Sequence, residues 1–214
     1  NTPPWPYVDS MALESPSHPC NKSGDAQKVK KNCSGPPEND FSDKCCKARK
    51  CVLLPYSPNK CCSNNGKQMT PHHVVPKSQF KEPGKKGQAL ELDSGGTYNQ
   101  AKAPCICEDG NSHSTGKHGE IHTETNNLTV NHASVLPHVS ATGKSIKKEA
   151  RWKVSDSEAT GAQATSDVTK CDKDCLEAQV RKGHENMGIN ENDDIRPSTA
   201  GRVTDPPTGT SEGY

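Results

Sequence analysis

Hydrophobic side chains are sparse along this chain and recur with a regular period in only one long stretch. In residues 171–189, Leu176, Val180 and Met187 follow one another near helical spacing. Apolar side chains at that spacing collect on one face of a helix. This stretch is therefore the clearest helix that the pattern predicts.

Two shorter stretches have the character of strands. The strongest apolar run, Cys51–Tyr56, predicts a short strand or a single helical turn that is closed by Pro55. A second run, Ala103–Cys107, leads into the turn signal Asp109-Gly110. Each run is too short to form a large sheet.

The two ends of the chain show no lasting period of 2 or 3.6. Residues 1–40 are rich in Pro, Ser, Asn and Lys, and they predict an extended arm pinned by Cys20 and Cys33, or a flexible linker. Residues 198–214 predict a flexible tail. The folded domain is therefore expected within residues 41–197.

A third stretch without a clear pattern lies inside this domain. Residues 129–170 are rich in Asn, Ser, Ala, Thr, Gly and Lys and resemble a long surface connection. Within it, residues 145–154 predict a basic helix or strand. We expect this stretch to be an arm laid over a small folded unit.

The composition limits what such a chain can be. Only 29% of the residues are hydrophobic and 4% are aromatic, which excludes a large apolar core. No stretch approaches the ~18 consecutive apolar residues that a membrane span requires. The formal net charge is +1, so a broad basic surface for nucleic acid is also disfavoured, although a local basic cleft is compatible with it.

Eleven cysteines indicate that cross-links or metal take the place of a core. The odd number leaves at least one thiol outside any intramolecular pair. Adjacent cysteines seldom bond to each other because the ring is strained, so each is expected to bond to a distant partner. We favour disulfides over a structural zinc site for the predicted structural set: Cys45, Cys46, Cys51, Cys61, Cys62, Cys105, Cys107, Cys171 and Cys175.

One candidate for chemistry is a pair of histidines spaced four residues apart. His118 and His122 would lie about 6 Å apart on one face of a helix, which allows two imidazoles to hold one divalent ion. Thr115 and Gly116 suit the loop that enters such a helix. The zinc-protease motif requires Glu directly after the first His, and this chain has Gly119 there, so a metalloprotease is disfavoured.

A second candidate is the adjacent pair His72-His73, which precedes the stiff sequence Val74-Val75-Pro76. Adjacent residues on a strand point to opposite faces. One imidazole can therefore reach a metal while its neighbour faces the substrate. A hairpin followed by a helix, with histidines from both, describes the ββα-metal site of HNH nucleases.

At these residues the chain resembles the GHH-type (Tox-GHH2) toxin nucleases of the HNH/endonuclease VII superfamily. The resemblance runs from about residue 41 to 197 and is carried by Ala48-Arg49-Lys50-Cys51, Leu54-Pro55-Tyr56, Cys61-Cys62, Thr70-Pro71-His72-His73-Val74-Val75-Pro76, Ala103-Pro104-Cys105-Ile106-Cys107, His118-Gly119-Glu120-Ile121-His122 and Cys171-x-x-x-Cys175. The family is named for a glycine before the two histidines. Here Pro71 stands in that place, and proline locks the backbone differently.

The resemblance implies an α+β fold of low regular structure, with a ββα-metal (His-Me finger) nuclease core, cysteine-stapled loops and long extended arms. It implies a metal-dependent endonuclease in which His73 is the general base. His72, His118 and His122 would hold one divalent ion. Three imidazoles suit zinc, nickel or manganese, whereas magnesium prefers oxygen ligands, and the sequence does not choose between these four ions.

Further residues are assigned roles around this centre. The asparagine of HNH sites orients the base or closes the loop, and the candidates for that position are Asn99, Asn111 and His113. The predicted DNA contacts come from local positive charge at Lys77, Lys81 and Lys117. No base-reading motif is visible, so little sequence specificity is expected.

The resemblance also implies a biological setting. The chain would be an antibacterial toxin DNase that is delivered by type VI secretion, behind a PAAR-type tip domain of the PAAR/VgrG apparatus. It would act on double-stranded DNA in the cytoplasm of the target bacterial cell, and a cognate immunity protein would protect the producer. A chain that begins without a start signal is expected for a fragment or a processed product of such an effector.

Two alternatives remain open. One is an RNase on the same scaffold. The other is a disulfide-rich secreted binding protein without catalysis, which draws on the cysteine count and on three matches to the glycosylation pattern at Asn21, Asn32 and Asn127. This second alternative leaves the histidines unused.

Overall fold

The computed structural model describes residues 5–8, 10–82, 88–111, 114–133, 138–139 and 149–198. Its α-helices are α1 (Ser10–Glu14), α2 (Pro19–Lys22), α3 (Asp25–Asn32), α4 (Asp43–Ala48), α5 (Gly116–Ala133), α6 (Val154–Thr169) and α7 (Lys173–Glu185). Short 3-10 helices are η1 (Pro37–Asn39), η2 (Lys77–Phe80) and η3 (Gln100–Lys102). The strands are β1 (Leu54–Pro55), β2 (Ser63–Asn64), β3 (Lys67–Gln68), β4 (Thr70–His73), β5 (Pro104–Glu108), β6 (His138–Val139), β7 (Glu149–Ala150), β8 (Trp152–Lys153) and β9 (Asp194–Ile195).

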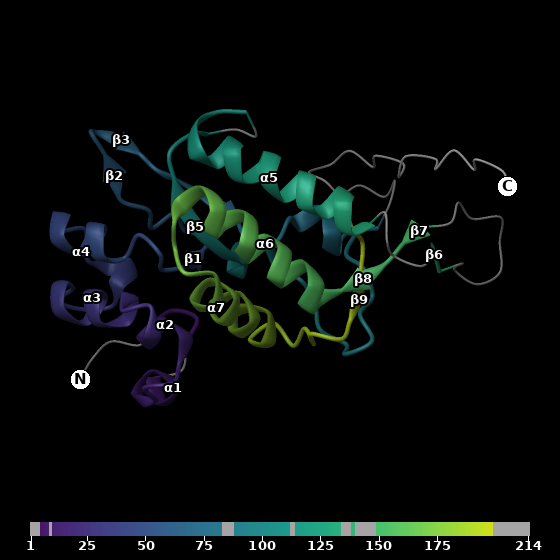
Figure 1. Cartoon of the computed structure of the whole chain (residues 1–214), viewed down its shortest axis with the longest axis horizontal. Coiled ribbons are helices and arrows are strands. Elements are labelled where there is room, and N and C mark those ends of the chain that lie inside the picture. Colours follow the sequence, from purple (N-terminus) through teal and green to yellow (C-terminus); the bar gives the residue numbers. More distant parts are fainter. Residues whose placement is uncertain are drawn as a thin grey trace, which may run out of the picture.

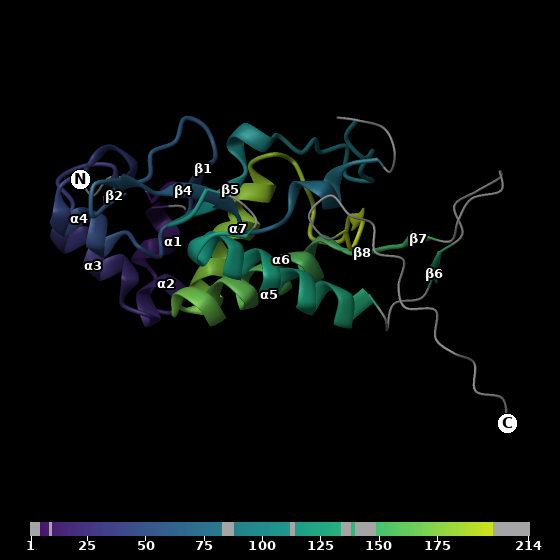
Figure 2. The same cartoon turned by 90° about the horizontal axis from the view of Figure 1, so that it is seen from above.

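A layer of three helices carries a small sheet. Helix α6 packs against both α5 and α7 (Figure 1). The sheet has the antiparallel order β1-β5-β4, with His72 opposite Ile106 and Leu54 opposite Cys105. The sheet lies over the helices in the second view (Figure 2). The chain is thus an α+β protein of small sheets, and the predicted fold class is confirmed.

The main core fills the space between the sheet and the helices. It combines Val74 and Ile106 from the sheet side with Ile121 from α5 and Leu176 and Val180 from α7, and all five are buried. Burying side chains of this size removes apolar surface from water and holds the two layers together. Among the described residues, no helix is both long and apolar enough to cross a membrane.

Residues 154–169 form the half-buried helix α6, whereas the sequence predicted a surface connection over residues 129–170. Gly161 lies where α6 crosses the end of β4, and a Cβ atom there would come within 2.3 Å of the Val74 carbonyl oxygen. Ala162 and Ala164 are also fully buried. The inward face of α6 consists mainly of small residues, so the helix gives no signal in large apolar side chains. Of residues 145–154, strands β7 and β8 are described and residues 145–148 lie outside the described part.

The N-terminal region forms short helices, and the predicted extended arm over residues 1–40 is wrong for residues 10–39. The Trp5 indole N–H donates to the side-chain oxygen of Gln179 on α7. The same oxygen accepts from the Leu53 backbone N–H at 2.8 Å. These helices are held by disulfides and by a small apolar cluster that includes Val8, Ala26 and Val29, which are too widely spaced to give a lasting periodic pattern. The predicted tail beyond residue 198 lies outside the described residues.

Ten of the eleven cysteines form five disulfides: Cys20–Cys175, Cys33–Cys45, Cys46–Cys62, Cys51–Cys171 and Cys61–Cys107. Neither adjacent pair bonds internally, as predicted. Cys105 is a buried free thiol, so its assignment to the cross-linked set is wrong. Every other cysteine has a partner, and burial raises the pKa of this thiol well above its usual value.

Candidate metal centre

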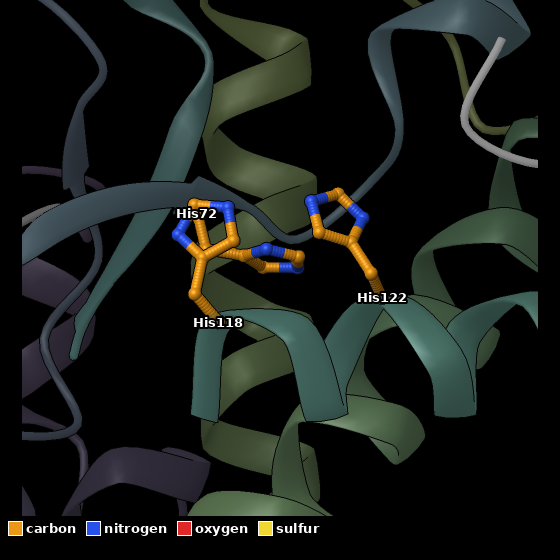
Figure 3. Close-up of side chains that lie close together, drawn as sticks. All are labelled: His72, His118 and His122. Atoms are coloured by element: carbon orange, nitrogen blue, oxygen red, sulfur yellow. The ribbon is translucent and has the colours of Figure 1, made fainter. Parts of the chain in front are cut away.

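Three histidines from β4 and α5 lie together (Figure 3). The ring centroid of His72 is 4.8 Å from that of His118 and 4.4 Å from that of His122. The ring centroids of His118 and His122 are 5.1 Å apart. One ring nitrogen of each residue lies within 4.8 Å of the other two. His72 is buried, while the other two rings are half-buried. The site is therefore closed on the sheet side.

The local backbone explains why these rings converge. On β4, the side chains of Thr70 and His72 share one face because successive residues alternate. Helix α5 begins at Gly116, and the residue before it, Thr115, packs against the turn at Gly110, which has φ of 101°. A Cβ atom there would lie 2.0 Å from the Thr115 carbonyl oxygen, so the turn requires glycine. The His118 backbone N–H then donates to the Asp109 carbonyl at 3.0 Å and fixes the first turn of α5 beside the strand.

The donor set fits a divalent ion that prefers nitrogen ligands. Imidazole nitrogens lie about 2.0–2.1 Å from a bound zinc ion, so nitrogens within 4.8 Å of one another need only small ring rotations to share one. A second group of potential ligands, Cys33, Asp40 and Cys45, does not qualify because its two sulfurs form a disulfide. Within the described part of the chain, the histidine cluster is thus the candidate metal centre.

The Thr70 side chain contacts the imidazole ring of His118 and sets its orientation. Its hydroxyl donates its single hydrogen to the Gly110 carbonyl oxygen. The hydroxyl oxygen of Thr70 also lies 2.9 Å from Nδ1 of His118. Because its one hydrogen is already donated, this oxygen can only accept a hydrogen bond from His118. This contact places the proton of His118 on Nδ1, so Nε2 is the nitrogen that could bind a metal.

Replacing Thr70 with valine is expected to weaken binding of Zn²⁺ or Mn²⁺ by about 10- to 100-fold, because valine keeps the shape but cannot hold the Nδ1 proton. Thr70→Ser should restore most of the affinity. Isothermal titration with each ion measures this. Thr123→Val is the control, since the Thr123 hydroxyl donates to the Gly119 carbonyl on the same helix. Equal affinity in Thr70→Val and the wild-type protein would contradict this role.

His73 occupies a different environment from its neighbour. Its ring stacks on Tyr56, with centroids 4.5 Å apart. Burial lowers the pKa of His73 to about 4; contact with the Gln100 backbone carbonyl opposes this shift, and the charge of Lys77 adds to it. Its Nε2 has no hydrogen-bond partner among the described residues. His73 is thus an uncharged imidazole at neutral pH, with a buried Nε2 that accepts no hydrogen bond from the described residues.

The predicted asparagine candidates lie on the loops around the centre. Asn99 caps η3 by accepting from the backbone N–H groups of Ala101 and Lys102, and it thereby shapes the turn that presents the Gln100 carbonyl. Asn111 is exposed and accepts from the Thr115 hydroxyl at 3.3 Å in the turn before α5. His113 lies outside the described residues.

The three predicted DNA-contacting lysines come from two segments, with Lys77 and Lys81 at the ends of η2 and Lys117 at the start of α5. Lys77 is exposed just after β4, and its charge reaches His73. Lys117 is half-buried and precedes His118 at the start of α5. Lys81 is half-buried, and its backbone is bridged to Ala89. DNA contact by these lysines stays a prediction.

Two supporting residues were not assigned a role from the sequence. Thr70 stands two residues before His72, and period-2 alternation on a strand is a signal that would have placed it on the same face. Tyr56 lies in the motif Leu54-Pro55-Tyr56, but its stacking on His73 depends on the pairing of β1 and β4 with β5. That pairing is not visible in the linear sequence.

Comparison with known proteins yields two matches. A family model described as "GHH signature containing HNH/Endo VII superfamily nuclease toxin 2" matches residues 69–184, which is more than half of the chain. The chain is also 29% identical over 234 aligned residues to the DNase toxin Tse7 of Pseudomonas aeruginosa PAO1. That alignment covers 95% of this chain and 59% of the relative's length. No solved structure matches the chain.

Proposed function

Because this chain belongs to the family of GHH-signature nuclease toxins in the HNH/Endo VII superfamily, we propose that it is an antibacterial toxin that hydrolyses DNA. One observation carries this proposal. Three imidazoles converge on a point, and the residue next to one of them is an uncharged histidine whose Nε2 accepts no hydrogen bond from the described residues. The similarity to a toxin named as a DNase supports DNA as the polymer.

The residues divide the chemistry of phosphodiester hydrolysis between them. His73 takes the proton of the attacking water, for which an unprotonated imidazole is required. His72, His118 and His122 hold the divalent ion, with Thr70 orienting His118. When bound, the ion withdraws negative charge from the scissile phosphate and the leaving oxygen. Tyr56 and the Gln100 carbonyl hold the base in place.

The wider setting forms part of the proposal. We place the site of action in the cytoplasm of a target bacterial cell, with delivery by type VI secretion through a PAAR/VgrG apparatus. A cognate immunity protein with an acidic surface would cover the cleft in the producer. The divalent ion is zinc, manganese, nickel or magnesium. Little sequence specificity in the cut sites is expected.

Incubation of the purified chain with plasmid DNA and with RNA tests this function. We expect nicking of the plasmid with Mn²⁺, Mg²⁺, Zn²⁺ or Ni²⁺ and no nicking with EDTA, because EDTA removes the ion that would stabilise the charge on the scissile phosphate. Cleavage of RNA in place of DNA would favour the RNase alternative. No cleavage of either polymer by folded, metal-loaded protein would refute a nuclease. In a strain whose cytoplasm permits disulfide formation, expression should be lethal and a co-expressed neighbouring gene should rescue growth.

A further inference from the structure

A cavity of about 660 Å³ lies beside the candidate metal centre. It is bounded by α4, by the turn between β2 and β3, by the end of β5 and by the start of α5. Lys117, which lines it, directly precedes His118. The volume falls within the roughly 300–1,000 Å³ of small-ligand sites. The cavity is thus a separate site next to the proposed reaction centre.

A buried acidic side chain contributes to the wall of this cavity. Glu108 is the last residue of β5 and lines the cavity. Only 4% of its surface is exposed. Its Oε1 atom has no hydrogen-bond partner among the described residues. Buried acceptors are nearly always paired, because leaving one unpaired costs its full desolvation. This oxygen therefore points to a ligand that brings a hydrogen-bond donor.

Positive side chains form the other part of the lining. Lys47 and Lys117 line the cavity and form no ion pair within the described part of the chain. Lys50 also lines it and donates to the Thr169 carbonyl at 2.8 Å. The Arg49 guanidinium is buried and bonded to the Pro37 carbonyl, so it shapes the wall and is not available to a ligand. Asp43 and Asp109 also line the cavity, so its available positive charge is confined to Lys47 and Lys117, and an anion would lie against these two side chains.

A ligand that satisfies both parts carries a negative charge at one end and a donor at the other. We propose that this cavity binds one nucleotide of the DNA strand beside the scissile phosphate, with its phosphate against Lys47 and Lys117 and an amino group of its base on Glu108. Cytosine, adenine and guanine carry such an amino group. Thymine lacks one, since its ring N–H stands between two carbonyl acceptors. The site therefore disfavours thymine at one position near the cut, a bias at a single base that leaves the overall sequence specificity low.

This inference rests on the proposed DNase function, and two measurements test it separately from that function. The first is sequencing of the ends that the metal-loaded protein releases from random duplex DNA. Wild-type protein should deplete thymine about 5-fold or more at one fixed position relative to the cut. Glu108→Leu should lose that depletion without a fall in melting temperature, because it removes an unpaired buried acceptor. A purely structural role for Glu108 would instead lower the melting temperature.

The second measurement is the binding constant for a short DNA duplex in EDTA. Fluorescence anisotropy measures it at several salt concentrations. Lys47→Ala and Lys117→Ala should each reduce the slope of log K against log salt by about one. Lys44→Ala is the matched control on α4, since Lys44 does not line the cavity. Unchanged base composition in Glu108→Leu, or unchanged slopes in both lysine variants, would overturn the inference. A wild-type protein that binds and cuts no DNA would refute the proposed function itself.

Discussion

Replacing His73 with alanine is expected to reduce the rate of DNA cleavage by about 10²- to 10⁴-fold, the usual contribution of a positioned general base. The ring is held between Tyr56 and the Gln100 carbonyl, and burial lowers its pKa to about 4, so no other protonation state competes at neutral pH. Initial rates of plasmid nicking at saturating metal measure the loss.

The same variants separate a base from a ligand. His73→Ala should bind the metal ion as the wild-type protein does, whereas His118→Ala should lose both metal affinity and cleavage. His132→Ala is the control, because residue 132 lies about 15 Å further along α5 than His122. If His73→Ala keeps more than a tenth of the wild-type rate, or if it alone loses the metal, then the two roles have been assigned wrongly.

Loss of the long-range disulfides is expected to unfold the chain. The Cys51–Cys171 and Cys20–Cys175 bonds close loops with sequence separations of 120 and 155. Loop-closure entropy assigns each about 4–5 kcal/mol, and a whole domain has only about 5–15 kcal/mol. Urea denaturation of oxidised and fully reduced protein, followed by circular dichroism, should show the transition shifted to near zero urea in the reduced chain.

Single bonds allow a sharper comparison. The Cys33–Cys45 bond has a sequence separation of 12, one tenth of that of Cys51–Cys171. Replacing both cysteines by serine should therefore cost roughly 2 kcal/mol less at the short bond than at the long one. Cys105→Ala is the control, since it removes a thiol without removing a bond. Equal costs for the two bonds would contradict loop closure as the source of stability.

Elements that carry their own local signal were predicted from the sequence. Helix α7 has apolar residues at helical spacing, and β5 ends in an Asp-Gly turn. Helix α6 was missed because its inward face is built from residues such as Gly161 and Ala162, which pack through close backbone contact. Small residues have no hydrophobic period, so only the neighbouring β4 and α5 reveal that this segment is helical.

The residues of the candidate site also fall into those predicted from local sequence and those that only the folded structure reveals. The histidines were selected by their spacing, and the structure brings His72, His118 and His122 together. Their surroundings depend on contacts across the chain. Thr70 acts on His118, 48 positions later, and the unpaired oxygen of Glu108 is apparent only once the strands and α5 are packed. The pairing of ten cysteines likewise follows from packing and not from spacing.

The disulfide connectivity has a consequence for how the protein is made. Pairing the cysteines in the order in which they leave the ribosome would join Cys20 to Cys33, and this bond is not native. Cys20 and Cys51 can form their native bonds only after Cys175 and Cys171, near the end of the domain, have been synthesised. Oxidation of a nascent chain therefore creates wrong bonds that thiol–disulfide exchange must undo. Production of active protein will depend on an isomerase or a redox buffer, and not on an oxidant alone.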